Sequence, residues 1–223
     1  MPLVDSNLQA TWDSLYRCRD GNGQVIHYVR AGLKQYVGDG ADILIDVLAA
    51  KGMVAGQRIA LVGAGFGWVA ERFVARGFGP MANGTAAGRV AAIDTSTWIQ
   101  ANRAGNANVN ILNADVNGAT GRRAVRQEFG SNNTVIDWAI TEDVLPILSG
   151  TVIGQASEIV PFCQSVRALA TNVAHWLTTG TRRYDNPEVW AGDSRLNWKT
   201  LEDWKAWTTP DWVVARNENG RVL

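Results

Sequence analysis

The sequence predicts an α/β fold in which helices cover both faces of a mostly parallel, twisted sheet. Short, continuous apolar runs alternate with stretches of helical periodicity through the middle of the chain. A glycine-rich turn follows the first apolar run directly, and an acidic residue ends each of the next two. Right-handed crossovers would bring these features together at the carboxyl edge of the sheet, where such sheets bind their ligands.

The first part of the chain is predicted to be helical. Residues 8–37 have mixed helical periodicity, interrupted at residues 20–23, and residues 41–53 place their apolar side chains on one helical face. We therefore expect an N-terminal helical extension over residues 1–40, followed by one main domain over residues 41–223.

The central part of the chain alternates between strands and helices. Residues 59–62 are continuously apolar, as is typical of a parallel strand that is buried on both faces. The composition of residues 79–88 predicts a flexible loop. Further strands are expected at 89–94, 108–115, 134–141 and 172–179, and helices at 68–78, 120–130, 142–150 and 156–170.

The last part of the chain predicts a short helix over residues 200–207 and then two short apolar runs. The turn residues 217–220 join these runs, so we expect a closing antiparallel hairpin at the C-terminus.

Charge and cysteine content narrow the function classes. The chain of 223 residues has 21 basic and 21 acidic side chains, and this balance disfavours binding to nucleic acid. Arg122, Arg123 and Arg126 are interpreted as a solvated helix face. Cys18 and Cys163 are too few for a disulfide framework. The sequence shows neither an apolar run of about 20 residues nor a signal peptide, so we expect a cytoplasmic protein that does not enter membranes.

The glycine-rich turn is the first candidate site. Gly63, Gly65 and Gly67 follow the first strand, where a tight strand-to-helix turn favours residues without a Cβ and a ligand can approach the backbone. Dinucleotide-binding turns carry a further glycine at the position that Trp68 occupies here. The pattern therefore disfavours a pyrophosphate ligand.

Two acidic residues extend this candidate site. Asp94 ends the second strand, where its carboxylate can accept hydrogen bonds from both hydroxyls of a ribose or can cap a helix. Asp115 ends the third strand, where it can accept a hydrogen bond from an exocyclic adenine amine or cap a turn. The ordered combination of glycine turn and two acids is more specific than any one of them.

The segments VGAGFGW, AAIDTS, NAD and VIDWAITEDVL resemble the successive motifs of the Rossmann-like, class I S-adenosylmethionine-dependent methyltransferases. The resemblance covers about residues 41–180. It implies that S-adenosylmethionine is the cofactor and that residues 1–40 form a lid. The residues it implies for cofactor binding are Gly63, Gly65 and Gly67 at the methionine part and ribose, Asp94 at the ribose hydroxyls, Asp115 at the adenine amine, Ala114 or Val116 beside the ring, and Thr141 at the methionine end.

Departures from known motifs bear on the methyl acceptor. Amino-methylating nucleic-acid enzymes of this family carry an Asp/Asn-Pro-Pro-aromatic motif where this chain has residues 137–140, which contain no proline. Cytosine-C5 enzymes need a Pro-Cys nucleophile, whereas Cys163 follows Phe162 and is interpreted as a buried cysteine. We therefore favour a small-molecule or protein acceptor over nucleic acid.

Methyl transfer needs a general base only if the acceptor must lose a proton. His175, in the fifth predicted strand, is the best candidate because imidazole titrates near neutral pH, although a histidine satisfied by its neighbours is the structural alternative. Glu142 would face a cationic acceptor or cap the following helix, and Trp68 would stack on adenosine or the sulfonium. The sequence shows no metal-binding spacing.

The sequence thus predicts an S-adenosylmethionine-dependent methyltransferase that transfers its methyl group by in-line displacement to an unidentified acceptor. Three alternatives stay open: an enzyme of the same fold that cleaves the cofactor, a non-catalytic cofactor-binding module, and an NAD-dependent oxidoreductase.

Overall fold

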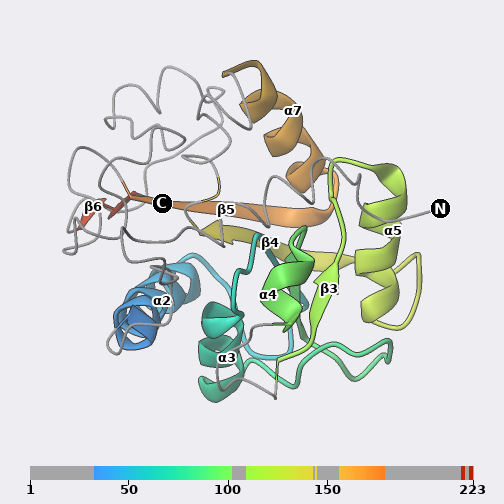
Figure 1. Cartoon of the computed structure of the whole chain (residues 1–223). Helices are drawn as coiled ribbons and strands as arrows, with labels where there is room; N and C mark the ends of the chain where they lie inside the picture. Colours follow the sequence, from blue (N-terminus) through green and yellow to red (C-terminus); the bar gives the residue numbers. More distant parts are fainter. Residues whose placement is uncertain are drawn as a thin grey trace.

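A computed structural model describes residues 33–101, 109–142, 144, 156–178, 217–218 and 221–222. Strands and helices alternate along these residues, and the strands form one twisted sheet (Figure 1). In chain order, the elements are α2 (Leu33–Ala50), β1 (Ile59–Val62), α3 (Trp68–Ala75), β2 (Val90–Asp94), α4 (Thr97–Ala101), β3 (Ile111–Asn113), α5 (Ala119–Glu128), β4 (Ile136–Glu142), α7 (Ala156–Arg167), β5 (Ala170–Thr178), β6 (Asn217–Glu218) and β7 (Arg221–Val222).

The sheet order is β3-β2-β1-β4-β5-β7-β6. The pairings among β1 to β5 are all parallel, and β1 lies in the middle between β2 and β4. All residues of β1 and β2 are buried. This burial explains why the two strands are continuously apolar up to Asp94 and show no alternation. The predicted α/β fold with a mostly parallel sheet is confirmed.

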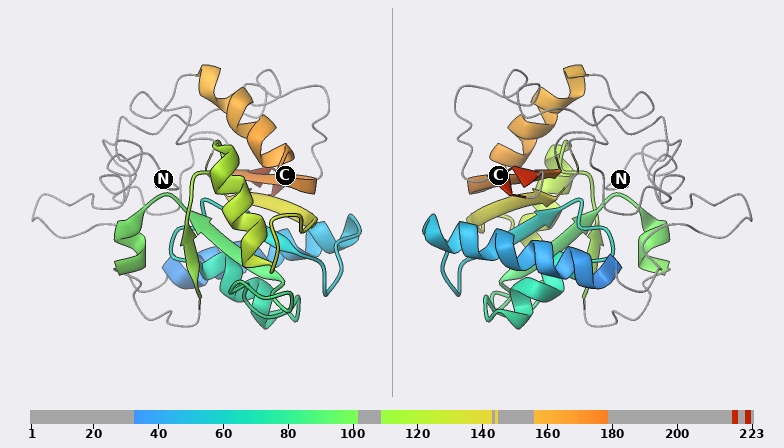
Figure 2. Two further views of the ribbon diagram at one scale, coloured as in Figure 1. Left: turned by 90° about the vertical axis from the view of Figure 1, so that its right-hand side faces the viewer. Right: turned by 90° about the vertical axis from the view of Figure 1, so that its left-hand side faces the viewer.

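Helices cover both faces of the sheet. Figure 2 shows α2 and α3 on one face and α5 and α7 on the other. Leu44 and Leu48 of α2 and Phe73 of α3 are fully buried in the core. Asp42 of α2 forms an ion pair with Arg72 of α3 and a second one of 3.2 Å with Arg76, the residue that caps the end of α3. The two helices thus pack against each other on this face of the sheet.

Several element bounds differ from the predictions. The helix expected at 41–53 already begins at Leu33 and ends at Ala50, so it crosses the expected boundary after residue 40. Gly38 and Gly40 lie within the first half of this helix despite the low helix propensity of glycine. Helix α4 was not predicted, and it begins where the Ser96 hydroxyl accepts a hydrogen bond of 3.4 Å from the Ile99 N–H. The N-terminal extension as a separate lid stays a prediction.

The segment at residues 79–88, predicted to be flexible, makes specific backbone contacts. The Ala82 N–H donates to Val90 O at 2.7 Å, and the Gly84 N–H donates to Glu128 O at 2.8 Å, at the end of α5. A Cβ on Gly130 would lie 2.8 Å from the Ala86 nitrogen. The glycine at position 130 therefore allows the chain after α5 to pack closely against this segment, for which composition alone suggested only mobility.

Two short strands continue the sheet beyond β5. β7 pairs antiparallel with the end of β5, and β6 pairs antiparallel with β7. Most residues of the predicted hairpin, and the helix expected at 200–207, lie outside the described residues, so both stay predictions. Among the helices described, none combines the length and the apolar character needed to cross a membrane.

Candidate functional site

The turn between β1 and α3 has a backbone that favours glycine at three alternating positions. Gly63, Gly65 and Gly67 have φ angles of 72°, 53° and 77°, in the left-handed region that other residues seldom adopt. A Cβ on Gly63 would collide with a side-chain methyl group of Val144, just beyond β4. The Ile93 carbonyl of β2 accepts hydrogen bonds from the N–H groups of Gly63 and Ala64, at 2.8 and 2.9 Å. The turn is therefore held against the end of β2.

Trp68 begins α3 and lies beside the turn. It is buried and stacks on Phe66, with ring centroids 5.3 Å apart and an interplanar angle of 21°. Phe66 in turn meets Trp98 of α4 edge to face. Trp68 thus belongs to an aromatic cluster of α3 and α4, which explains why a large residue occupies this position. Its stacking on a cofactor stays a prediction.

Asp94 joins the end of β2 to the glycine turn. Its side chain is buried, and the residue is only 3% exposed. One carboxylate oxygen accepts a hydrogen bond of 2.9 Å from the Gly65 N–H, and the other accepts one of 2.8 Å from the Ser96 N–H. These two bonds tie the end of β2 both to the glycine turn and to the residues that lead into α4. The Ser96 hydroxyl caps α4 by accepting from the Ile99 N–H, whereas the sequence suggested such a cap as the structural alternative for Asp94.

Asp115 lies in the loop between β3 and α5. Its Oδ1 accepts a hydrogen bond of 2.9 Å from the Asn117 N–H, and its main-chain oxygen accepts one of 3.3 Å from the Gly118 N–H. The neighbouring Ala114 and Val116 are buried. The Ala114 N–H donates to Asp94 O at 3.2 Å, so the two acidic strand ends are linked through the backbone.

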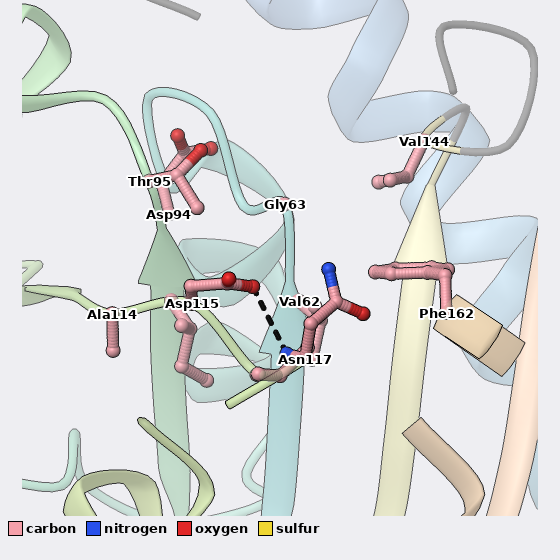
Figure 3. A pocket seen from close by; sticks show the side chains of 11 residues that line it. Val62, Gly63, Asp94, Thr95, Ala114, Asp115, Asn117, Val144 and Phe162 are labelled. Carbon is pink, nitrogen blue, oxygen red and sulfur yellow. Dashed lines mark hydrogen bonds between the residues drawn. The ribbon is translucent and has the colours of Figure 1, made fainter. Parts of the chain in front are cut away.

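These strand ends border one pocket of about 450 Å³, part of which is open to solvent. Figure 3 shows Asp94 and Thr95 on one side, Val144 and Phe162 on the other, and Asp115 and Asn117 between them. The described residues that line the pocket are Val62, Gly63, Ile93, Asp94, Thr95, Ala114, Asp115, Val116, Asn117, Val144 and Phe162. Two carboxylates thus face a largely apolar space.

The structure brings together Gly63, Asp94, Ala114, Asp115 and Val116 from the predicted cofactor site. Sequence reasoning missed the remaining lining residues. Thr95 directly follows Asp94, and Asn117 directly follows Val116. Their position next to predicted residues at strand ends could therefore have identified them. Val144 and Phe162 come from segments after β4, and only the tertiary packing brings them to the pocket.

The predicted residues of β4 and β5 lie side by side. Thr141 and His175 are register partners in the sheet, and Thr141 Oγ1 and His175 Nδ1 are 2.7 Å apart in a buried hydrogen bond. Burial lowers the pKa of His175 to about 3. Neither residue is among those that line the pocket. Glu142 ends β4, and its side chain lies outside the described part, so the catalytic roles of His175 and Glu142 stay predictions.

Cys163 lies next to Phe162 on α7. It is partly buried and forms no disulfide, and burial raises the pKa of its thiol to about 12. A thiol with so little thiolate at neutral pH is a poor nucleophile. Within the described part of the chain, no group of three or more His, Cys, Asp or Glu side chains is arranged to hold a metal ion.

The sequence matches no protein-family model and no curated protein. Solved structures are similar to it in fold. An S-adenosylmethionine-dependent methyltransferase from Anabaena variabilis superposes with a TM-score of 0.57 at 14% identity, over 98% of this chain and 88% of that one. The plantazolicin methyltransferase BpumL, in complex with a pentazolic desmethylPZN analogue and SAH, superposes with a TM-score of 0.50 at 12% identity, over 90% of this chain and 74% of that one. The chain therefore has the fold of the class I methyltransferases, as its motifs predict.

Proposed function

We propose that this protein is an S-adenosylmethionine-dependent methyltransferase. The main evidence is that a turn whose glycines have positive φ angles and two carboxylates border the same pocket, at the carboxyl edge of the parallel strands. The likeness in fold to methyltransferases of known structure supports the same activity.

The residues of the pocket fit this cofactor chemically. Asp94 and Asp115 offer hydrogen-bond acceptors, and S-adenosylmethionine presents donors at its ribose hydroxyls and its adenine amine. The buried Ala114 and Val116, with Phe162, offer apolar surface to a purine ring. Trp68 occupies the position of the third glycine of dinucleotide-binding turns, and this favours S-adenosylmethionine over NAD.

In the proposed mechanism, the protein mainly binds the cofactor and orients it toward the acceptor. When bound, S-adenosylmethionine supplies a methyl group on a sulfonium, which the acceptor attacks in line. Asp94 would accept hydrogen bonds from the ribose hydroxyls, and Asp115 would accept one from the adenine amine. The turn at Gly63 would let the methionine part approach the backbone. Such alignment can supply several kcal/mol of the reduction in the barrier.

If the acceptor must lose a proton, a side chain near the pocket has to accept it. His175 is neutral at physiological pH, but a pKa of about 3 makes it a weak base, and it already bonds to Thr141. Glu142 is the better placed of the two candidates, because it ends β4 two residues before Val144, which lines the pocket. We propose Glu142 for contact with the acceptor, which is a small molecule or protein rather than nucleic acid. A cytoplasmic setting stays a prediction from the sequence.

The first test is calorimetric titration of the purified chain with S-adenosylhomocysteine and, in parallel, with NAD. We expect micromolar binding of S-adenosylhomocysteine and no binding of NAD. The reverse result would replace the proposal with a nicotinamide oxidoreductase, and binding of neither ligand would remove the cofactor assignment.

A second experiment separates methyl transfer from other uses of the same cofactor. The protein is incubated with S-adenosylmethionine labelled in the methyl group, with and without pools of candidate acceptors, and the products are separated. We expect S-adenosylhomocysteine and a labelled acceptor to appear together. Consumption of the cofactor without an acceptor would indicate cleavage, and binding without any turnover would indicate a non-catalytic module.

A further inference from the structure

The loop of residues 114–118 forms one wall of the pocket and leads directly into α5. Within the loop, the N–H groups of Asn117 and Gly118 donate to Asp115, and the carbonyl oxygens of Val116 and Asn117 accept from a donor outside the loop. Gly118 caps α5 without a side-chain hydrogen bond. The position of Asp115, which this loop carries into the pocket, therefore depends on contacts made by α5.

Arg122, one turn into α5, makes these contacts. Its Nη1 donates to Val116 O at 2.7 Å and to Asn117 O at 2.8 Å, so a single guanidinium nitrogen bridges two consecutive carbonyls of the loop. The Arg122 backbone N–H donates to Gly118 O at 3.1 Å. An arginine suits this task because it stays charged and presents its donors in a rigid fork.

A second residue of α5, Gly121, packs against the same loop. Gly121 is buried, and a Cβ at this position would collide with the main-chain oxygen of Asp115. The helix thus packs its backbone directly against the main chain of Asp115, while Arg122 holds the next two residues. Together these contacts fix the turn in which Asp115 Oδ1 accepts from the Asn117 N–H.

We infer that Arg122 is a positioning residue that makes the pocket selective for adenine over hypoxanthine, by holding the loop that carries Asp115. This inference rests on the proposed function. Adenine carries an amine at C6, which donates to a carboxylate, whereas hypoxanthine carries a carbonyl there, which a carboxylate repels. A carboxylate distinguishes the two bases only while its position is fixed, because a mobile loop can turn the acid away from the carbonyl.

The test compares two ligands that differ only at the base, S-adenosylhomocysteine and S-inosylhomocysteine. Calorimetry gives the dissociation constant of each for the unaltered chain and for Arg122→Met and Arg122→Lys. The matched control is Arg126→Met. Arg126 lies one turn further along the same helix, and its Nη2 also donates to a carbonyl outside the helix, Ala168 O, at 2.7 Å, but it holds no part of the pocket.

We expect the unaltered chain to bind the adenine ligand at least about tenfold more tightly, a difference of about 1.4 kcal/mol. Arg122→Met should lose most of this preference and bind S-adenosylhomocysteine about tenfold more weakly. Arg122→Lys, whose ammonium can still reach one carbonyl, should be intermediate. Arg126→Met should keep both the affinity and the preference. A merely structural role would lower the melting temperature and weaken both ligands equally.

Two results would overturn the inference. One is an unaltered chain that binds both ligands equally well. The other is a folded Arg122→Met, or Arg122→Lys if the methionine variant does not fold, that keeps the full preference for adenine. Failure of the unaltered chain to bind S-adenosylhomocysteine at all would instead overturn the proposed function.

Discussion

Replacement of Asp94 by asparagine tests the centre of the site. The carboxylate of Asp94 accepts hydrogen bonds from the N–H groups of Gly65 and Ser96 and is proposed to accept further bonds from the ribose of the cofactor. Asparagine has nearly the same shape but only one acceptor oxygen and no charge. One of the two backbone N–H groups would therefore face an amide NH₂ group, and the ligand would lose its charge-assisted partner.

The size of both effects follows from these bonds. A hydrogen bond to a charged group contributes about 1.5–3 kcal/mol, so we expect the affinity for S-adenosylhomocysteine to fall by about 2 kcal/mol, or roughly thirtyfold. The backbone N–H left without an acceptor in a buried position should lower the free energy of unfolding by about 1–3 kcal/mol. The two losses are measured separately, by calorimetric titration and by denaturant unfolding.

Asp42→Asn is the matched control. Asp42 also bonds to its partners through its carboxylate, but these partners are Arg72 of α3 and Arg76 at the end of that helix. The variant should leave ligand affinity unchanged and cost no more than about 1 kcal/mol of stability. A folded Asp94→Asn with an unchanged dissociation constant would refute the ribose assignment. An unchanged free energy of unfolding would refute its role as the link between β2 and the glycine turn.

Three further predictions concern single residues. Gly63→Ala should lower the melting temperature more than Gly52→Ala, because both positions have positive φ (72° and 96°) but only the first lacks space for a Cβ; equal losses would contradict the proposed close packing. Burial lowers the pKa of His175 from 6.5 to about 3, so between these pH values the unfolded chain binds a proton that the folded chain does not. The free energy of unfolding should therefore fall as the pH drops from 6.5 to 3, by about 1.4 kcal/mol per pH unit from this group. His175→Asn should remove that part of the pH dependence, as measured by unfolding curves at several pH values. In a Cys18→Ser background, Cys163, with its pKa raised to about 12, should react with a thiol reagent at pH 8 over a hundredfold more slowly than in the unfolded chain, and a similar rate would show that the thiol is accessible.

The parallel sheet and its order along the chain were accessible from the sequence because their signals are local. A buried parallel strand is apolar throughout, and the runs at β1 and β2 carry this pattern without interruption. The ends of the helices were harder to predict where tertiary packing outweighs helix propensity. Helix α2 begins at Leu33 despite its internal glycines, and α4 is too short to produce a periodic pattern.

Cofactor residues at strand ends were also predictable, since the carboxyl ends of parallel strands always meet at one edge of the sheet. This rule predicts that Gly63, Asp94 and Asp115 lie together, and all three line the same pocket. The sequence also suggested His175 as a base, because imidazole titrates near neutral pH. The sequence does not reveal that this imidazole is buried and bonded to Thr141.

The sequence by itself determined the fold class, the glycine turn and the two acids of the pocket, because each depends on neighbours within a few residues. Only the tertiary structure decided that Val144 and Phe162 complete the pocket and that Arg122 holds the loop of Asp115. These relations depend on how segments pack after the chain has turned back on itself. Burial and hydrogen-bond partners at such distances are properties of the folded chain, and no local pattern encodes them.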